Sequence, residues 1–431
     1  MPLGRRVAGL VAGSLALGGL VLPWAPPAYA EQAACSEIQQ DTTEADDVTE
    51  PSVPLQQLRV EEATKVLERR GVRPGEGVGV AVIDSGIADV PGLPQAGGSR
   101  NPAFAKGRDY PYYHGTAVAG LIAGADRGGE AGPVGIAPAA SLYDVRVYDT
   151  PTDSDDGKYR GLTDAGVIDG LEWVAANARS VSPRIRIANV SLAVKDSPEL
   201  RQVVRRLAAL GVVVVAAAGN RPTSADDPVL EDFAGEPRPG EDAAKVVFPA
   251  GYPTVVAATS SVPRGVDARN FVLQNSATDI AVPTMDGVSY AVNGVTCLLP
   301  PEAATSWAAA ETSGILALLM SAFPDESPAE TVNRLYRSAT GVDDVTTRLT
   351  GHGIAQPVEA LQRPLSFGQR GRPETSETEN TTQQARAPRP EKDVLEDTRH
   401  DAMWWGLAGG GALVIALLLR PVLARKRPED R

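Results

Sequence analysis

Short apolar runs, each ending in small or polar residues, recur along the middle of the chain. They are GVGVAVIDSGI, IRIANVSLAV and GVVVVAAAGN, with a weaker example, VVAAT, at 255–259. Apolar runs rich in β-branched residues are typical of parallel strands buried on both faces. The stretches between them, such as GLTDAGVIDGLEWVAANAR and SPELRQVVRRLAAL, are amphipathic and predict helices. The alternation predicts an α/β fold with a mostly parallel sheet between helices.

Polar residues stand where the predicted strands end. Asp84, Ser191 and Asn220 each lie at the end of one apolar run. Functional groups of open α/β sheets gather at the carboxyl ends of the strands. Two other residues stand at predicted helix starts, His114 at the head of HGTAVAGLIAG and Ser306 in ATSWAAA. These five positions are the candidate functional residues.

Asp84, His114 and Ser306 supply the three groups that a nucleophilic serine requires. A serine hydroxyl needs an adjacent base, and histidine suits that task because it titrates near neutrality. A carboxylate then orients the imidazole and stabilises its protonated form. The order Asp, His, Ser along the chain is one of three known orders of this triad. Taken singly, an Asp after a strand is more often a turn former, and a Ser before a helix is more often an N-cap.

Four segments together resemble the subtilisin-like serine proteases, the subtilases. They are VAVIDSGI, HGTAVAG, VVVVAAAGN and ATSWAAAETSG, and the resemblance extends over roughly 71–361. It implies a three-layer subtilisin-like α/β domain and a serine endopeptidase. It also implies that Asp84 orients His114, that His114 is the general base and then the general acid, and that Ser306 is the acylated nucleophile.

The resemblance also implies roles for residues around the triad. Asn220, in the AAGN segment, would donate to the oxyanion beside the backbone N–H of Ser306. Ser191 and Leu192, in NVSLAV, would bind the substrate backbone as an added strand. Many subtilases bind calcium, but no carboxylate cluster of this sequence can be assigned to that ion. The sequence therefore assigns no metal site and no cofactor, and a structural calcium ion stays an unassigned alternative.

The chain departs from the family pattern at three alanines. Ala304 replaces the Gly before Thr-Ser, Ala193 replaces the Gly of Ser-Leu-Gly, and Ala310 replaces the Pro four residues after the serine. A methyl group can crowd a place where backbone must approach the substrate. An alternative interpretation is therefore a catalytically weak, subtilase-like scaffold that stabilises a secretion complex. The complete set of catalytic residues and Asn220 argue against it.

Both ends of the chain carry apolar segments. Residues 1–30 have a basic start, an apolar middle and small residues before the end, which predicts a signal peptide cleaved after Ala30. An uncleaved anchor helix is the alternative. Residues 402–419, AMWWGLAGGGALVIALLL, carry no charge and span about 27 Å as a helix, which predicts a transmembrane helix. The basic tail at 420–431 is expected in the cytoplasm, and the segment before the helix outside the cell membrane.

The rest of the chain divides by composition. An N-terminal extension is expected at 31–70 and a catalytic domain at 71–367. Within that domain, 221–245 is a loop insertion with seven acidic residues and four prolines. Residues 368–401 are rich in Pro, Glu, Thr and Gln, which predicts a disordered linker.

This order of segments resembles the mycosins, membrane-anchored subtilases associated with type VII secretion. The resemblance implies protein substrates and a type VII secretion membrane complex as partner. A general surface-anchored subtilase remains an alternative. Nucleic acid is an unsuitable partner because 41 basic residues stand against 54 acidic ones, a net charge of −13.

The chain has two cysteines, Cys35 and Cys297. A location outside the cell membrane is oxidising, and each cysteine is the other's only intramolecular partner, so we predict a disulfide between them. Two unpaired thiols, or a lipid-modified Cys35, are the alternatives.

Overall fold

A computed structural model of the chain describes residues 33–43, 45–95, 99–100, 109–224, 227, 229–342, 345–367 and 396–423. The chain forms two units, Met1–Glu374 and Thr375–Arg431, which are considered separately. The predicted signal peptide lies outside the described residues, as do most of the predicted cytoplasmic tail and most of the predicted linker.

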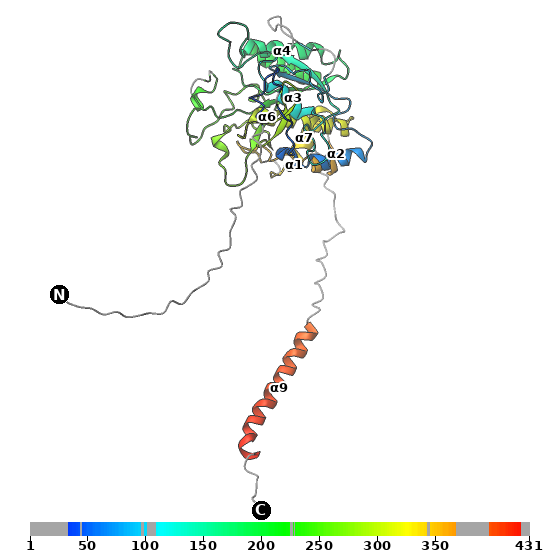
Figure 1. The fold of residues 1–431 in the computed structure, drawn as a ribbon, viewed down its shortest axis with the longest axis vertical. Coiled ribbons are helices and arrows are strands. Elements are labelled where there is room, and N and C mark those ends of the chain that lie inside the picture. Colours follow the sequence, from blue (N-terminus) through cyan, green and yellow to red (C-terminus); the bar gives the residue numbers. More distant parts are fainter. Residues whose placement is uncertain are drawn as a thin grey trace, which may run out of the picture. The chain divides into compact units, whose positions relative to one another are not determined.

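The first unit, drawn in Figure 1 with colours that follow the sequence, is built on a six-stranded sheet. The strand order is β2-β1-β3-β4-β5-β6, and all neighbouring strands are parallel. This confirms the predicted fold class. The strands are β1 (Gly79–Asp84), β2 (Ser141–Arg146), β3 (Ile185–Val190), β4 (Val213–Ala217), β5 (Val255–Ser261) and β6 (Ile280–Pro283). The four apolar runs of the sequence correspond to β1, β3, β4 and β5.

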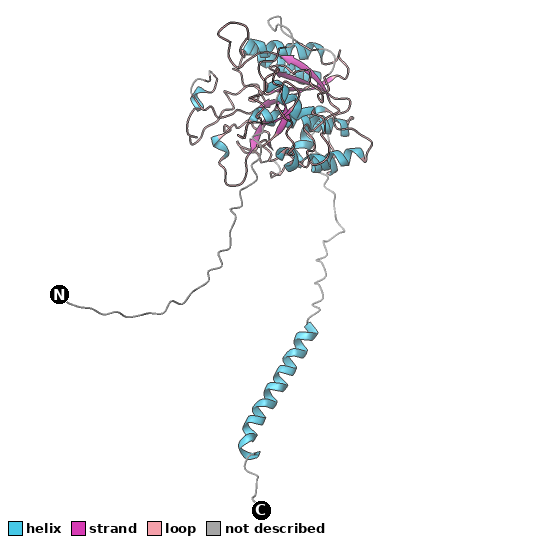
Figure 2. Cartoon of the chain, viewed as in Figure 1, coloured by secondary structure: helices cyan, strands magenta, loops and turns pink. Residues whose placement is uncertain are grey.

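Helices cover both faces of this sheet (Figure 2). They are α3 (His114–Ala123), α4 (Asp164–Asn177), α5 (Pro198–Leu210), α6 (Thr305–Ala322), α7 (Pro328–Ser338) and α8 (Pro357–Gln362), with 3₁₀ helices η1 (Glu231–Phe233) and η2 (Ala268–Asn270) in loops. Alternate side chains of β1 enter different cores. Val80 and Val82 pack in one core with α3 and α6, whereas Ala81 and Ile83 pack in the other with α4 and α5. The result is three layers, helix, sheet and helix.

The predicted N-terminal extension packs on this unit. It contains α1 (Val53–Gln57) and α2 (Val60–Glu68), and its first described residues lie beside the antiparallel hairpin β7 (Val288–Tyr290) and β8 (Thr296–Leu298). Ala34 forms an isolated bridge with Leu298, and the backbone N–H of Cys35 donates to Leu298 O over 2.8 Å. A disulfide joins Cys35 to Cys297.

The described part of the second unit is one helix, α9 (Glu396–Leu423). By length and composition alone, residues Thr398–Pro421 are sufficient to cross a membrane. The helix starts six residues before the expected 402–419 segment, so 396–401 are helical rather than part of an irregular linker.

Candidate active site

Asp84 and His114 come together because two glycines allow their loops to touch. Asp84 is the last residue of β1, and His114 is the first residue of α3. A Cβ atom on Gly115 would lie 2.4 Å from the carbonyl oxygen of Gly86, so only glycine fits there. Gly86 itself has φ +100°, a conformation that side chains disfavour. The Gly115 N–H donates to Ser85 Oγ over 2.9 Å, which joins the two segments.

The carboxylate of Asp84 binds the imidazole of His114. His114 Nδ1 lies 2.8 Å from Asp84 Oδ1 and 3.0 Å from Oδ2. The carboxylate is fully buried, and its Oδ1 also accepts from the Ser85 N–H at 2.7 Å and from the Tyr148 hydroxyl at 3.1 Å. An ionised carboxylate only accepts, so the hydrogen-bond network places the imidazole proton on Nδ1. Nε2 is then left to accept a proton, as a general base must.

Ser306 lies in the first turn of α6. The N-cap of this helix is Ala304, and Ser306 lies two residues further into the helix, so the N-cap interpretation of Ser306 is wrong. Backbone N–H groups in a first helical turn have no acceptor within the helix and make its N-terminus electropositive. The carbonyl of Ser306 accepts a hydrogen bond from Ser191 Oγ over 2.9 Å, which ties α6 to the end of β3.

Asn220 is oriented by the residue before the serine. Its Oδ1 accepts from the backbone N–H of Thr305 at 2.7 Å and from Thr305 Oγ1 at 2.9 Å. Because both of these hydrogen bonds use Oδ1, the amide nitrogen Nδ2 remains available as a donor. A donor of this kind can stabilise an oxyanion at the site.

One cleft of about 650 Å³ unites most of the predicted site. Its lining includes His114, Ser191, Leu192, Asn220 and Ser306. Asp84 is fully buried and does not line the cleft itself, but it contacts His114, which does. The structure therefore brings together the residues that the sequence singled out as a candidate triad, a candidate oxyanion donor and a candidate substrate-binding strand.

Aromatic rings enclose the imidazole. The ring of Trp307 lies 4.8 Å from that of His114, centre to centre, and the ring of Tyr112 stacks on it at 5.9 Å with an interplanar angle of 6°. Trp307 is buried, whereas Tyr112 also lines the cleft. These rings limit the rotation of the imidazole and keep water from much of its surface.

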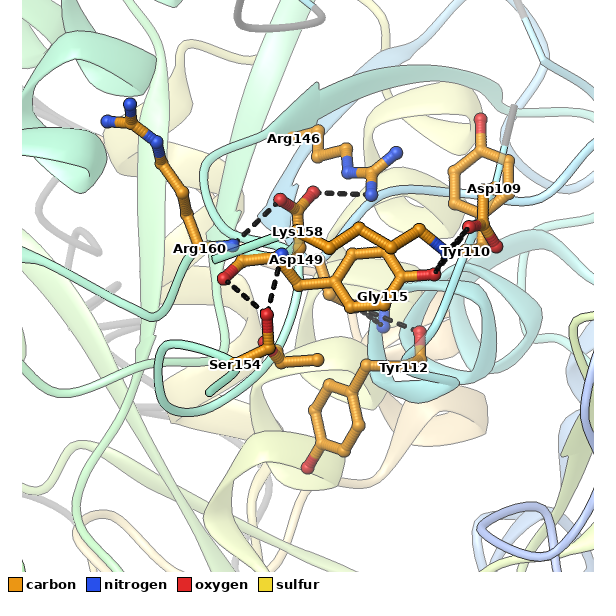
Figure 3. Close-up of polar contacts among 12 residues, drawn as sticks. Asp109, Tyr110, Tyr112, Gly115, Arg146, Asp149, Ser154, Lys158 and Arg160 are labelled. Atoms are coloured by element: carbon orange, nitrogen blue, oxygen red, sulfur yellow. Dashed lines mark hydrogen bonds and ion pairs between the residues drawn. The ribbon is translucent and has the colours of Figure 1, made fainter. Parts of the chain in front are cut away.

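One wall of the cleft is the loop between β2 and α4, and polar contacts fix this loop to the segment before α3 (Figure 3). Arg146 and Asp149 form a buried ion pair at the base of the loop. Further along, Asp109 accepts from Lys158 Nζ at 3.1 Å and from the Tyr159 hydroxyl at 2.5 Å. The loop is therefore held at both its base and its tip.

A second wall comes from the predicted acidic insertion, 221–245, which is folded in its described part. Asp227, Val229 and Leu230 line the cleft. The loop is anchored by a buried ion pair between Arg221 and Glu241. The described part of the insertion thus forms part of the cleft wall.

Three supporting residues were missed by sequence reasoning. Thr305 orients Asn220, and Ser85 and Tyr148 donate to Asp84. The positions of Thr305 and Ser85 beside motif residues could have drawn attention to them. Tyr148 carries a weaker signal, namely that it follows a strand whose carboxyl end meets that of β1.

The three alanines that depart from the subtilase pattern lie in different environments. Ala304 has φ −135° and ψ 134°, an extended conformation that any residue adopts, so its methyl group causes no backbone strain. Ala310 is fully buried inside α6. Ala193 lines the cleft, where its methyl group takes up space.

Among the described residues, no group of three or more His, Cys, Asp or Glu could hold a metal ion.

Comparison with known proteins agrees with this geometry. The profile of the subtilase family matches residues 75–353. Subtilisin E from Bacillus subtilis (strain 168) is 32% identical over 279 residues, which make up 62% of this chain and 61% of subtilisin E. The chain therefore spans less than two thirds of that relative. Mycosin-1 from Mycolicibacterium smegmatis (strain ATCC 700084 / mc(2)155) is 28% identical over 336 residues, 72% of either chain.

Solved structures of mycosins share the fold. The crystal structure of MycP1 from the ESX-1 type VII secretion system has a TM-score of 0.60 and 25% identity, covering 79% of this chain and 92% of that one. The MycP3 protease from the ESX-3 type VII secretion system has a TM-score of 0.55 and 27% identity, covering 77% and 92%. With the family profile matched over the strands, helices and cleft described above, this chain belongs to the subtilase family.

Proposed function

We propose that the protein is a membrane-anchored, extracytoplasmic serine endopeptidase with Asp84, His114 and Ser306 as its catalytic triad. The observation that carries this proposal is the hydrogen bond from His114 Nδ1 to the buried Asp84 carboxylate, 2.8 Å long, at a cleft that Ser306 also lines. Membership of the subtilase family supports the same chemistry.

The proposed reaction has two halves, acylation and deacylation of Ser306, and His114 transfers the proton in both. Nε2 of His114 takes the proton of Ser306 Oγ as the oxygen attacks the peptide carbonyl, and then gives that proton to the leaving amine. Asp84 stabilises the imidazolium that forms between these steps. Asn220 Nδ2 and the Ser306 backbone N–H donate to the developing oxyanion. Water then attacks the acyl group on Ser306, with His114 again as base.

The proposed substrate is a polypeptide in extended conformation. Ser191 and Leu192 follow β3 and line the cleft, where a substrate strand can pair with their backbone. Residues from the loop after β2 and from the acidic insertion line the cleft, and its volume of about 650 Å³ leaves room for a peptide segment. Similarity to MycP1 and MycP3, proteins of type VII secretion systems, supports exported proteins of such a system as substrates.

The proposed location rests on α9 and the disulfide. Thr398–Pro421 has the length and composition of a membrane span, and it follows the catalytic unit in the chain. The disulfide between Cys35 and Cys297 fits an oxidising compartment. With the basic tail in the cytoplasm, the catalytic unit is expected on the outer side.

A fluorophosphonate probe tests the proposal on the full chain solubilised in mild detergent. We expect the probe to label the wild type, and Ser306→Ala and His114→Ala to abolish labelling while melting temperatures stay near that of the wild type. Wild-type protein that is folded but unlabelled from pH 6 to pH 9 would instead support a scaffold without activity. Cleavage of proteins co-produced from a type VII secretion locus, absent with Ser306→Ala, tests the substrate class.

A further inference from the structure

We propose that Tyr148 is a positioning residue for the triad, whose hydroxyl holds the Asp84 carboxylate in the orientation in which it receives the His114 N–H. This inference rests on the proposed function, because the orientation matters only if Asp84 and His114 act on Ser306. Neither the sequence motifs nor the family profile assigns a role to Tyr148.

The sheet register brings Tyr148 to Asp84. The last residues of β1 and β2, Asp84 and Arg146, are paired, and the next N–H, of Val147, donates to Asp84 O over 2.9 Å. The chain leaving β2 therefore runs beside Asp84, and Tyr148 follows directly. Its hydroxyl donates to Asp84 Oδ1 over 3.1 Å, and its side chain is buried.

Asp84 needs such a donor because its carboxylate is fully buried. A buried anion is destabilised unless hydrogen bonds or an opposite charge replace its hydration. The nearby cation of β2, Arg146, is paired with Asp149 (Figure 3). Asp84 therefore relies on the neutral donors Ser85 N–H and Tyr148 OH besides His114. Neutral donors stabilise the Asp84 carboxylate without adding a second positive charge, which would compete with the His114 imidazolium for that carboxylate.

Tyr148 is suited to remain a donor. Burial, and then the negative charge of Asp84, raise the pKa of the Tyr148 hydroxyl well above its ordinary value. The phenol therefore stays protonated at any pH at which the enzyme is folded and active. Of the side chains that donate to Oδ1, it is the one that can lose its hydroxyl without altering the triad itself.

The ring of Tyr148 and its hydroxyl have different contacts. The side chain also lines the cleft, and its ring lies 6.2 Å from that of Tyr112. A change of the whole side chain would therefore alter both the cleft wall and the Asp84 contact. Tyr148→Phe removes only the hydroxyl and keeps the ring, so it separates the two effects.

The test compares Tyr148→Phe with the wild type as full chains in the same detergent. A hydrogen bond to a charged group is strong enough that its loss should lower kcat on a peptide substrate roughly tenfold. KM should stay within about twofold, because the ring still forms the wall. The rate of reaction with a small fluorophosphonate, which does not occupy the extended cleft, should fall by a similar factor.

Tyr143→Phe is the matched control. Tyr143 lies on β2 opposite Ala81 rather than Asp84, is buried, and donates its hydroxyl to Pro183 O over 2.6 Å. The Tyr143→Phe variant also loses one buried hydrogen bond, but not one to Asp84. We therefore expect this variant to keep the wild-type kcat and probe rate, even if its melting temperature falls. A loss of activity equal to that of Tyr148→Phe would attribute both effects to the stability of β2 and overturn the proposal.

The remaining outcomes distinguish the two proposals. A wild type that does not react with the probe removes the proposed function itself. A reactive wild type with an equally reactive Tyr148→Phe overturns only the role of Tyr148, and so does a variant that changes KM alone. Should Tyr148→Phe not fold, Tyr148→Leu carries the same test, with the same loss of probe rate expected and a higher KM in addition.

Discussion

Thr305 holds the side-chain oxygen of Asn220 with two hydrogen bonds, one from its backbone N–H at 2.7 Å and one from Oγ1 at 2.9 Å. The Thr305 hydroxyl in turn accepts from the Gly219 N–H at 3.2 Å. The amide plane of Asn220 is thereby fixed by the residue that immediately precedes Ser306. One residue links the nucleophile to the proposed oxyanion donor.

We predict that Thr305→Val lowers kcat roughly tenfold, because the Asn220 amide loses one of its two anchors and rotates more freely. Asn220→Ala should cost about 10²–10³ in kcat, since it removes the donor itself. Steady-state kinetics on a peptide substrate measure both, and KM should change little. Thr305→Ser keeps the hydroxyl and serves as the control. Wild-type kcat for Thr305→Val would mean that the backbone N–H alone orients Asn220.

Asp84, His114 and Ser306 could be proposed as a triad from the sequence, because each proposed role depends on a side chain within a short motif. The sequence did not reveal Tyr148, because the approach of that hydroxyl to Asp84 depends on how β2 pairs with β1. Neighbouring strands far apart in sequence acquire a register only in the folded sheet. Contacts of this kind follow from topology rather than from local pattern.

Strand β2 itself was missed because two charged residues interrupt its apolar pattern. Asp144 and Arg146 are both buried in the structure. Their burial is possible because Arg146 pairs with Asp149, and because desolvation raises the pKa of Asp144 to about 7, so that it can be neutral. A binary apolar pattern gives no sign of such compensation.

Glu311 should make the protein less stable as the pH rises. It lies inside α6, fully buried, and among the described residues neither carboxylate oxygen has a hydrogen-bond partner. Burial raises the pKa of Glu311 well above its ordinary value, so the folded state keeps a proton that the unfolded state loses above about pH 4.3. The folded state then binds more protons than the unfolded state, and its stability falls as the pH rises, until the folded-state pKa is reached.

Glu311→Gln should remove this dependence, because an amide does not titrate. Relative to the wild type, the variant should gain about 1.4 kcal/mol in unfolding free energy for each pH unit above the unfolded-state pKa. Denaturant unfolding from pH 5 to pH 8 measures the difference. Glu199→Gln, at an exposed position of α5, is the control and should follow the wild type. A constant difference between Glu311→Gln and the wild type at every pH would contradict the prediction.

The disulfide between Cys35 and Cys297 should stabilise the catalytic unit by tying the extension to β8. It joins residues 262 positions apart, and closing so long a loop strongly restricts the unfolded chain. Changing both cysteines to Ser should cost about 2–5 kcal/mol and lower the melting temperature. Thermal unfolding with and without reductant measures this, since reductant should lower the melting temperature of the wild type and leave the double variant unchanged.

Alkylation gives an independent check of the same bond. Both cysteines are fully buried, so neither should react in the folded protein, and neither should react after unfolding without reductant. Two added alkyl groups on the unfolded, unreduced protein would show two free thiols, and the alternative of unpaired cysteines would stand.

The ion pair between Arg221 and Glu241 should shape the cleft through the insertion it anchors. Both side chains are almost fully buried, with exposures of 5% and 2%, so removing one leaves the other charge without a partner. Such a loss costs about 3–5 kcal/mol. Because Val229 and Leu230 of this loop line the cleft, Glu241→Ala should also raise KM for peptides.

Two further variants show whether burial is the cause. Arg206 and Glu172 form an ion pair with half-exposed side chains, 52% and 43%, so Glu172→Ala should cost no more than about 1 kcal/mol and leave KM unchanged. Replacing both members of the buried pair, with Arg221→Met and Glu241→Leu, removes the unpaired charge and should recover much of the lost stability. If the double variant is as unstable as Glu241→Ala, the hydrogen bond from Arg221 to Phe233 O, 2.7 Å long, anchors the loop instead of the ion pair.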